Sequence, residues 1–189
     1  MKTAIIIHSV CGNNYLLAMA FAHGLKARGA EAAVFRVPDA TWVEKPDLSP
    51  KAREVVLAMR ALPEAVPQAL ADADLVIMGS PTYFGNVSGQ MKAFMDSTGG
   101  LWIKAKAAGK RFAAFTSAGH SEGGGDLCLQ AFHTYAKYMG MLSVPIPVNA
   151  VPGENVPVLG VIHYSSGKYA EQLDARTVRL IDAFCGILA

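Results

Sequence analysis

Charge is scarce in this sequence, and cysteine is scarcer. Charged residues make up 17% of the 189 residues and the formal net charge is +2. This excludes the strong electrostatic footprint of a nucleic-acid-binding protein or of a protein that docks on an anionic membrane. The three cysteines (Cys11, Cys128 and Cys185) are an odd number without Cys-x-x-Cys spacing. They favour neither a disulfide framework nor a zinc or iron–sulfur site, so we expect no metal and a reducing cytoplasm.

Long apolar runs are also missing. No uninterrupted run approaches the roughly 18–20 residues needed to span a bilayer, and no small-residue cleavage site follows the first apolar segment. Neither membrane insertion nor a signal peptide is therefore expected. Apolar residues in short runs are abundant, at 52% of the chain. This composition predicts one globular domain over residues 1–189 with a buried sheet, which also buries surface against copies of itself.

Predicted strands and helices alternate along the chain. The run Ala4–Ile7 is rich in β-branched residues and predicts a strand buried on both faces, as in a parallel sheet. Further strands are predicted at Glu31–Val37, Ala73–Pro81, Gly109–Gly119 and Gly140–Val148, and helices at residues 14–26, 51–60, 64–71, 88–97, 126–138 and 168–188. This alternation is typical of a doubly wound α/β sheet, here with five strands.

Three loops rich in Gly, Ser, Thr or Asn follow successive predicted strands: Ser9–Asn14, Pro81–Asn86 and Thr116–Gly125. The carboxyl ends of parallel strands meet at one edge of such a sheet, and ligands bind there, near the point where the strand order reverses. Ordinary turns use the same residue types. Their recurrence at three strand ends nevertheless favours a ligand site.

The first loop has the composition of an anion site. Ser9, Gly12, Asn13 and Asn14 lie between a strand and a helix, where backbone N–H groups and the helix dipole can converge on an anion. The loop lacks the endings of a Walker A motif and of a dinucleotide fingerprint. It contains no Lys or Arg, so neutral donors would hold the phosphate of a nucleotide that undergoes no phosphoryl transfer. The spacing resembles the flavodoxin phosphate loop, T/S-x-T-G-x-T.

The second loop combines turn residues with aromatic surface and has no catalytic acid, base or nucleophile. Thr82 and the following amides can hydrogen-bond the polar edge of a flat ring. Tyr83 and Phe84 either offer aromatic surface beside that ring or belong to the core. Gly85 permits a positive φ or a close backbone approach, and Asn86 can fix the turn. The loop therefore fits a flat redox cofactor that performs the chemistry itself.

A longer stretch carries a family resemblance. Residues Gly79–Trp102 read GSPTYFGNVSGQMKAFMDSTGGLW. This stretch closely resembles a block of the flavodoxin-like NAD(P)H:quinone oxidoreductases, the WrbA or Trp-repressor-binding protein family, within the NADPH-dependent FMN reductase and flavodoxin superfamily. The family pattern contains P-T-R-F-G-N and ends in T-G-G-L-W. The likeness continues through Gly109–Gly119 and residues 139–147 and covers most of the chain.

The resemblance implies a flavodoxin-like fold with strand order 2-1-3-4-5, helices on both faces and an FMN site at the three loops. The implied FMN contacts come from the first loop (Ser9, Val10, Cys11, Gly12, Asn13 and Asn14), the second loop (Pro81, Thr82, Tyr83, Phe84, Gly85 and Asn86) and the third loop (Ser117, Ala118, Gly119 and His120). Trp102 and Tyr138 match positions that border the substrate side of the flavin. Trp102 fits an ordinary buried or interface residue equally well.

The chain departs from the family pattern at informative positions. Tyr83 replaces an Arg, Cys11 replaces a Tyr and Tyr138 replaces a His. FMN binding withstands these replacements, whereas quinone reduction and the use of NADH involve the replaced side chains. His120 and Glu122 match the H-x-E of zinc deaminases, but the P-C-x-x-C of that signature is missing. His120 is therefore expected in a solvated loop or beside the flavin ring.

The leading hypothesis is an oxidoreductase that passes a hydride from NAD(P)H through FMN to a quinone or similar acceptor, with no catalytic side chain of its own. One alternative is a flavodoxin-type electron carrier, although a pI near 8.4 lacks the acidity of such carriers. The other is an FMN-binding protein with little turnover. The related enzymes are tetramers in which a neighbouring subunit helps to close the site, so a homo-oligomer, tetramer or dimer, is implied.

Some polar residues are expected to have no part in the site. His8, at the end of the first strand, is predicted to be a core histidine with satisfied hydrogen bonds. Asp39, Glu44 and Asp47 are predicted to be scattered acids of a surface insertion.

Overall fold

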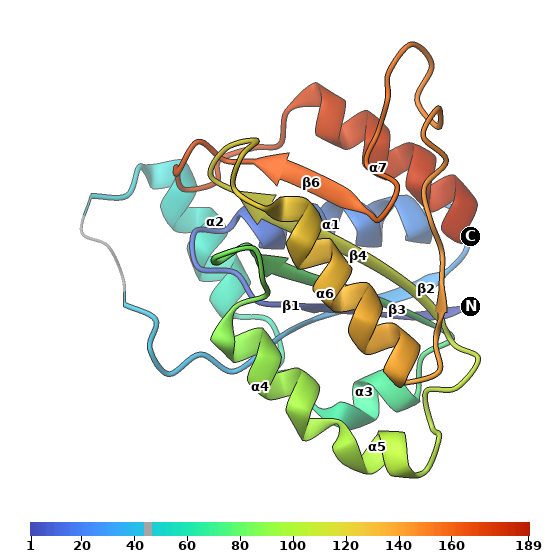
Figure 1. The fold of residues 1–189 in the computed structure, drawn as a ribbon. Coiled ribbons are helices and arrows are strands. Elements are labelled where there is room, and N and C mark those ends of the chain that lie inside the picture. Colours follow the sequence, from blue (N-terminus) through green and yellow to red (C-terminus); the bar gives the residue numbers. More distant parts are fainter. Residues whose placement is uncertain (44–46) are drawn as a thin grey trace.

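The computed structural model describes residues 1–43 and 47–189, and in it a parallel β-sheet lies between two layers of helices (Figure 1). Glu44 lies outside the described residues. The strands are β1 (Lys2–Ile7), β2 (Glu31–Arg36), β3 (Leu75–Pro81), β4 (Arg111–Ala118), β5 (Leu142–Ser143) and β6 (Val161–Tyr164). The helices are α1 (Asn13–Lys26), α2 (Pro50–Arg60), α3 (Pro67–Ala71), α4 (Gly89–Ser97), α5 (Gly99–Ile103), α6 (Gly125–Tyr138) and α7 (Ala175–Leu188).

The strand order is β2-β1-β3-β4-β5, with β6 also paired to β4, and every pairing is parallel. In register, Ile5 of β1 lies opposite Val34 of β2 and Ile77 of β3. The chain thus runs outward from β1 to β2 and then returns past β1 to β3. The predicted doubly wound order 2-1-3-4-5 is confirmed, and the order reverses where the first and second loops lie.

The apolar runs of β1, β3 and β4 are buried because helices cover both faces of the sheet. On the face covered by α1 and α7, Phe21 stacks on Phe115 with ring centroids 5.3 Å apart, and Phe184 contacts Phe21 edge-on at 6.0 Å. On the opposite face, Met91 of α4 and Phe132 of α6 are fully buried in a second cluster. Each face therefore holds its own apolar core, which fixes the strand ends in place.

The predicted fifth strand, Gly140–Val148, is wrong over most of its length. Only Leu142–Ser143 pairs with the start of β4, because Pro145 and Pro147 cannot donate to a ladder. The chain then makes an excursion and returns as β6, whose Val161 lies opposite Phe115 of β4. The edge position of the sheet is thus shared by two short strands, and β6 was not predicted.

The last helix begins seven residues later than predicted, at Ala175 instead of Lys168. It begins there because the Asp174 carboxylate accepts the N–H of Thr177 at 2.9 Å and caps the helix. The segment before it, residues 165–171, forms a loop at the carboxyl edge of the sheet. We call this segment the β6–α7 loop.

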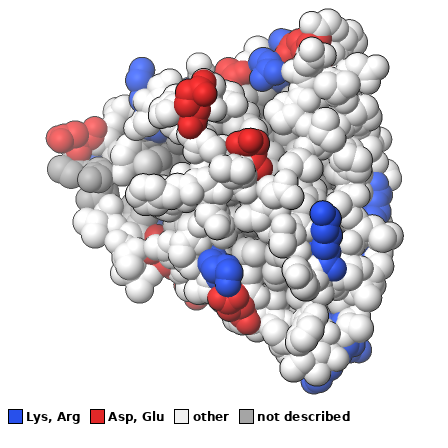
Figure 2. Space-filling model, viewed as in Figure 1, with Lys and Arg blue, Asp and Glu red and all other residues white. Residues whose placement is uncertain are grey.

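The charged residues form no large area of one sign on the face shown in Figure 2, where Lys and Arg alternate with Asp and Glu. Within the part of the chain that the structure describes, no helix combines the length and the apolar composition needed to cross a bilayer. The same residues contain no group of three or more His, Cys, Asp or Glu side chains placed to hold a metal ion.

Candidate functional site

The three predicted loops meet around one cavity of about 160 Å³ at the carboxyl edge of the sheet. Its lining comes from the first loop (Ser9, Val10, Cys11, Asn13 and Asn14), the end of β3 and the second loop (Pro81, Thr82 and Tyr83), the third loop (Ser117, Ala118 and Gly119) and the β6–α7 loop (Ser165, Gly167 and Lys168). The fold thus brings together most of the predicted site residues. Gly12, Phe84, Gly85, Asn86 and His120 lie in the same loops but do not line this cavity.

The first loop leaves the start of α1 uncapped. Its N-cap residue, Gly12, has φ 84° and no side chain that could cap the helix, and in the first turn the N–H of Tyr15 donates to Oγ of Ser9 at a long 3.4 Å. By contrast, α2, α4 and α7 are capped by Ser49, Ser88 and Asp174. A Cβ on Gly12 would lie 2.5 Å from Cγ1 of Val55, so the backbone here passes too close to α2 for a side chain. The free amides at the positive end of the helix dipole form a ready anion site.

Asn14 ties the first loop to the third. Its Nδ2 donates to Oγ of Ser117 at 3.1 Å, and both residues are buried. Its Oδ1 is also buried, yet among the described residues it has no hydrogen-bond partner. An unpaired buried acceptor is costly, and here it lies beside the cavity.

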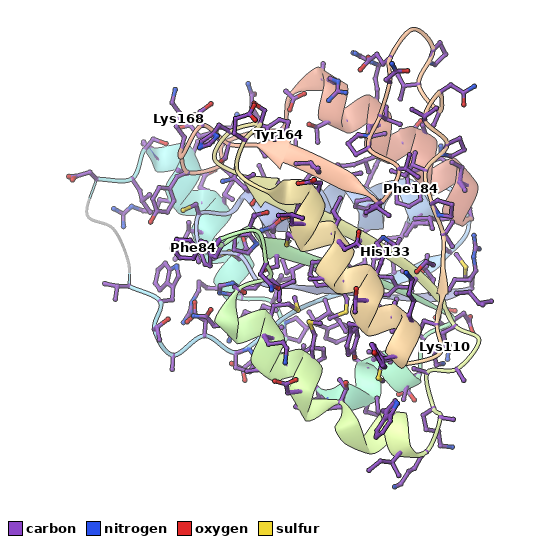
Figure 3. The ribbon with its side chains drawn as sticks, in the orientation of Figure 1. Phe84, Lys110, His133, Tyr164, Lys168 and Phe184 are labelled. Atoms are coloured by element: carbon purple, nitrogen blue, oxygen red, sulfur yellow. The ribbon has the colours of Figure 1, made fainter. Side chains whose placement is uncertain are left out.

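The second loop is a tight turn that projects an aromatic side chain into solvent. Tyr83 and Asn86 exchange both backbone N–H···O bonds, at 2.9 and 3.0 Å, and Oδ1 of Asn86 accepts the N–H of Val87. Phe84 and Gly85, at the corner, have φ values of 51° and 71°, the pattern of a type I′ turn. Phe84 is fully exposed, at 109%, and Tyr83 is 45% exposed (Figure 3). Neither is a core residue, and a bulky residue with positive φ is strained.

Thr82 has a structural role that was not predicted from sequence. Its N–H donates to Ser117 O at 2.9 Å, and its hydroxyl lies 2.8 Å from that of Thr116. Because the Thr116 hydroxyl donates to Ser80 O, the Thr82 hydroxyl is the donor of this pair. Thr82 therefore joins the second loop to the third, and the turn amides of Phe84 and Gly85 remain for a ring edge.

The third loop ends at a second uncapped helix. Helix α6 starts after Gly124, which has φ 74° and no side-chain cap. His120 is exposed, and its carbonyl accepts the N–H of Gly123 at 3.0 Å in a tight turn. The exposure fits the predicted solvated loop, and a place beside a bound flavin ring stays a prediction.

Trp102 and Tyr138 lie far from the cavity within one chain. Helix α6 runs from the carboxyl edge of the sheet to the opposite edge, where Tyr138 ends it, and α5 with Trp102 lies at that same lower end (Figure 1). A contact of 2.8 Å between the hydroxyls of Thr98 and Tyr135 joins the two segments. Trp102 is 57% and Tyr138 76% exposed. A single chain therefore does not bring either residue to the cavity.

A buried His–Asp pair next to the site was not predicted. His8 is 2% exposed, and its Nε2–H donates to Oδ2 of Asp39 at 3.1 Å. Burial opposes ionisation of Asp39, but hydrogen bonds from Thr41 and His8 outweigh it and lower its pKa to about 2. The prediction of Asp39 as a scattered surface acid is wrong, and Nδ1 of His8 has no partner among the described residues. Burial lowers the pKa of His8 despite this carboxylate.

The pairing of His8 and Asp39 had a signal in the sequence. Ile7 of β1 lies opposite Arg36 of β2, so His8 and Asp39 follow neighbouring parallel strands. These two residues line a second cavity of about 390 Å³ with Trp42, whose Nε1–H donates to Val10 O, and Tyr83 lines both cavities.

Lys168 of the β6–α7 loop was also missed. It lines the cavity, and its carbonyl accepts Nδ2 of Asn13 at 3.0 Å. An anion site made of neutral donors was predicted because the loop next to the first strand contains no charged residue. A residue that is distant in sequence and follows an unpredicted strand leaves no local signal.

A doubly wound parallel sheet, two helices that start on glycine at the site loops and an aromatic turn at the switch point are the features of a flavodoxin-like, FMN-binding α/β protein. The family model described as NADPH-dependent FMN reductase matches residues 1–155, and the chain belongs to this family. The resemblance drawn from the sequence is thereby confirmed.

Curated relatives carry the name NAD(P)H dehydrogenase (quinone). The protein from Geobacter sulfurreducens is 39% identical over 150 residues, which cover 78% of this chain and 72% of the relative. The protein from Syntrophobacter fumaroxidans is 34% identical over 180 residues, covering 94% and 87%.

Solved structures share the fold. A WrbA-like flavodoxin from Agrobacterium tumefaciens has a TM-score of 0.65 at 22% identity, covering 98% of this chain and 93% of that one. The two-electron reduced flavodoxin of Megasphaera elsdenii has a TM-score of 0.58 at 14% identity, covering 97% and 98%. At these identities the likeness concerns the fold alone.

Proposed function

We propose that the protein is an FMN-dependent oxidoreductase that takes a hydride from NAD(P)H and reduces a quinone or a similar small acceptor. The observation that carries the proposal is the single cavity formed by all three βα loops, at the uncapped start of α1. Membership of the NADPH-dependent FMN reductase family and the names of the curated relatives support the same activity.

The residues present fit FMN. The amides at the start of α1 and the hydroxyl of Ser9 are donors suited to a phosphate. The buried Oδ1 of Asn14, which lacks a partner among the described residues, is an acceptor suited to a flavin hydroxyl. The turn amides and the exposed rings of Tyr83 and Phe84 offer hydrogen bonds and aromatic surface to a flat ring.

The protein's part in catalysis is binding, orientation and exclusion of water. The hydride chemistry is supplied by FMN when it is bound. The first loop holds the phosphate end, and the bonds from Thr82 and Asn14 to Ser117 keep the three loops at fixed spacing. The Tyr83–Asn86 turn is closed by two backbone bonds, so it presents the aromatic side chains without reorganising. Because the Tyr83–Asn86 turn is exposed, a ring held beside it would be accessible to the donor and then to the acceptor, which predicts a ping-pong reaction.

The test begins with cofactor binding. FMN is titrated with the protein while flavin fluorescence is followed, and NADH or NADPH oxidation is then measured with and without a benzoquinone. We expect quenching, and oxidation that is faster with the quinone. Asn14→Ala should weaken FMN binding, whereas Asn149→Ala, in an exposed loop, should not. If saturating FMN produces no quenching, the proposed function is wrong.

An electron carrier is the second candidate, because flavodoxins share this fold. The near-neutral net charge argues against it, since a carrier that docks on basic partners needs an acidic surface. A reductive titration that proceeds in two separate one-electron steps, with no NAD(P)H consumption, would favour the carrier.

Self-association belongs to the proposal as well. Trp102 and Tyr138 are exposed at the edge opposite the cavity, so only a neighbouring copy can bring them to a flavin. We also propose that residues 1–189 form a single domain, because β6 pairs with β4 and α7 packs on α1. We further propose that the protein acts in the cytoplasm.

A further inference from the structure

We propose that the β6–α7 loop closes the phosphate end of the cavity and that Lys168 makes the site selective for phosphorylated flavin over riboflavin. This inference rests on the proposed function. It concerns residues 165–171, which lie beyond the segment that matches the family model.

The β6–α7 loop is fastened to two of the three site loops. The N–H of Ala170 donates to Cys11 O at 2.8 Å, and Nδ2 of Asn13 donates to Lys168 O at 3.0 Å. At its other end, the N–H of Ser165 donates to Ala118 O at 2.9 Å. These bonds fix the backbone of the loop across the start of α1.

A tight turn brings Lys168 to the cavity. Ser166 has φ 53°, a left-handed conformation that is rare for a residue with a side chain. The N–H of Lys168 donates back to Ser165 O at 3.0 Å and closes the turn. Figure 3 shows Lys168 and Phe84 on the same side of the molecule, the side where the strands end. The strained turn thus places Lys168 among the residues that line the cavity.

Lys168 is the one charged residue among those lining the cavity in the described chain. A phosphomonoester carries about −1.5 to −2 charges at pH 7, and the helix dipole of α1 supplies only a partial positive charge. Lys168 is exposed and carries one positive charge on a residue of this lining, so its ammonium group can offset part of the phosphate charge, which the neutral first loop cannot do. Riboflavin lacks the phosphate and gains nothing from it.

Two of the three nearby acids are engaged elsewhere. A neighbouring cleft of about 690 Å³ is lined by Asp47, Glu171 and Asp174 as well as Lys168. The Glu171 carboxylate accepts the Ser49 hydroxyl, and Asp174 caps α7. In residues 1–43 and 47–189 the Lys168 ammonium forms no ion pair, so it remains available to a phosphate.

The experiment compares FMN with riboflavin. Each flavin is titrated with wild type, Lys168→Ala, Lys168→Arg and the control Lys104→Ala, a change at the opposite edge of the sheet. Lys168→Ala should weaken FMN binding by about tenfold, the lower range for a hydrogen bond to a charged group because the side chain is exposed. Lys168→Arg keeps the charge and should stay within about threefold of wild type. Riboflavin affinity should be unchanged, and the salt dependence of FMN binding should decrease in Lys168→Ala.

The outcomes separate the two proposals. If Lys168→Ala binds FMN as tightly as wild type with the same salt dependence, or loses affinity equally for both flavins, the role of Lys168 is refuted and the proposed function stands. If wild type fails to bind FMN, the proposed function itself falls. Thermal unfolding of each variant shows whether the loop still folds.

Discussion

Gly12→Ala tests whether the geometry of the first loop depends on a residue without a side chain. Gly12 has φ 84°, and a Cβ there would lie 2.5 Å from Cγ1 of Val55 and 3.3 Å from Cβ of Ala170. The first neighbour is on α2 and the second is in the β6–α7 loop. The substitution therefore strains the backbone and pushes apart two segments that hold the start of α1.

The expected loss of folding free energy in Gly12→Ala is the sum of three contributions. A left-handed conformation costs a residue with a side chain about 1–2 kcal/mol, and overpacking costs about 1–3 kcal/mol. Alanine also restricts the unfolded chain, which returns about 0.4–1 kcal/mol. The net loss should be about 2–3 kcal/mol, which lowers the melting temperature of a chain of this size by about 4–12 °C.

Val55→Ala provides the control because it removes the atom that clashes. Alone, it should cost about 1 kcal/mol for the lost methyl groups of a half-buried side chain. Combined with Gly12→Ala, it should restore the part of the loss that comes from overpacking, with a coupling energy of about 1–2 kcal/mol. The strain from positive φ should remain.

The assay is thermal unfolding of the two single variants and the double variant, followed by FMN titration of each. Gly12→Ala should also weaken FMN binding, since the displaced amides no longer converge on the phosphate. If the two substitutions are additive within about 0.5 kcal/mol, the clash with Val55 is not the cause of the loss. If Gly12→Ala is as stable as wild type, the whole account of this loop is wrong.

Two further predictions concern strain and protonation. Phe84→Gly should leave the melting temperature unchanged or raise it, because glycine relieves the left-handed strain. It should weaken FMN binding by about two- to tenfold, because an aromatic contact is lost. A fall in both the melting temperature and the FMN affinity would contradict the proposed role of the turn. Lowering the pH from 7 to 5 should lower the free energy of unfolding, because burial lowers the pKa of His8, His133 and His163 in the folded state. As the pH falls below about 6.5, the unfolded chain binds protons before the folded chain does. This lowers the free energy of unfolding by up to about 1.4 kcal/mol per pH unit for each histidine. Melting curves at several pH values measure this slope, and His133→Gln should reduce it.

The sheet and the three βα loops could be predicted because their signals are local. The apolar runs of β1 and β3 and the turn residues after them suffice to locate strand ends, and parallel strand ends meet at one edge. The positive φ expected at Gly85 and the turn fixed by Asn86 are both present. In each case a few neighbouring residues decide the outcome.

What could not be predicted depends on contacts between distant segments. β6 is four residues long and is a strand only because β4 offers it a free edge beyond β5. Lys168 reaches the cavity because β6 ends there. The pair of His8 and Asp39 requires knowing that β1 and β2 are neighbours. The predicted strand order already makes β1 and β2 neighbours. Applying that order to the residues that follow the two strands would therefore have found this pair.

The two long helices that follow site loops begin differently from the capped helices. Helices α2, α4 and α7 are closed by Ser49, Ser88 and Asp174, whereas α1 and α6, which follow the first and third site loops, start on glycine without a side-chain cap. Glycine in place of a capping side chain costs only a few tenths of a kcal/mol, and the left-handed Phe84 costs about 1–2 kcal/mol. A ligand present at about 100 times its dissociation constant stabilises the fold by about 2.7 kcal/mol. Bound FMN is therefore sufficient to offset the stability that these residues give up, and all of them belong to the three loops that surround the cavity.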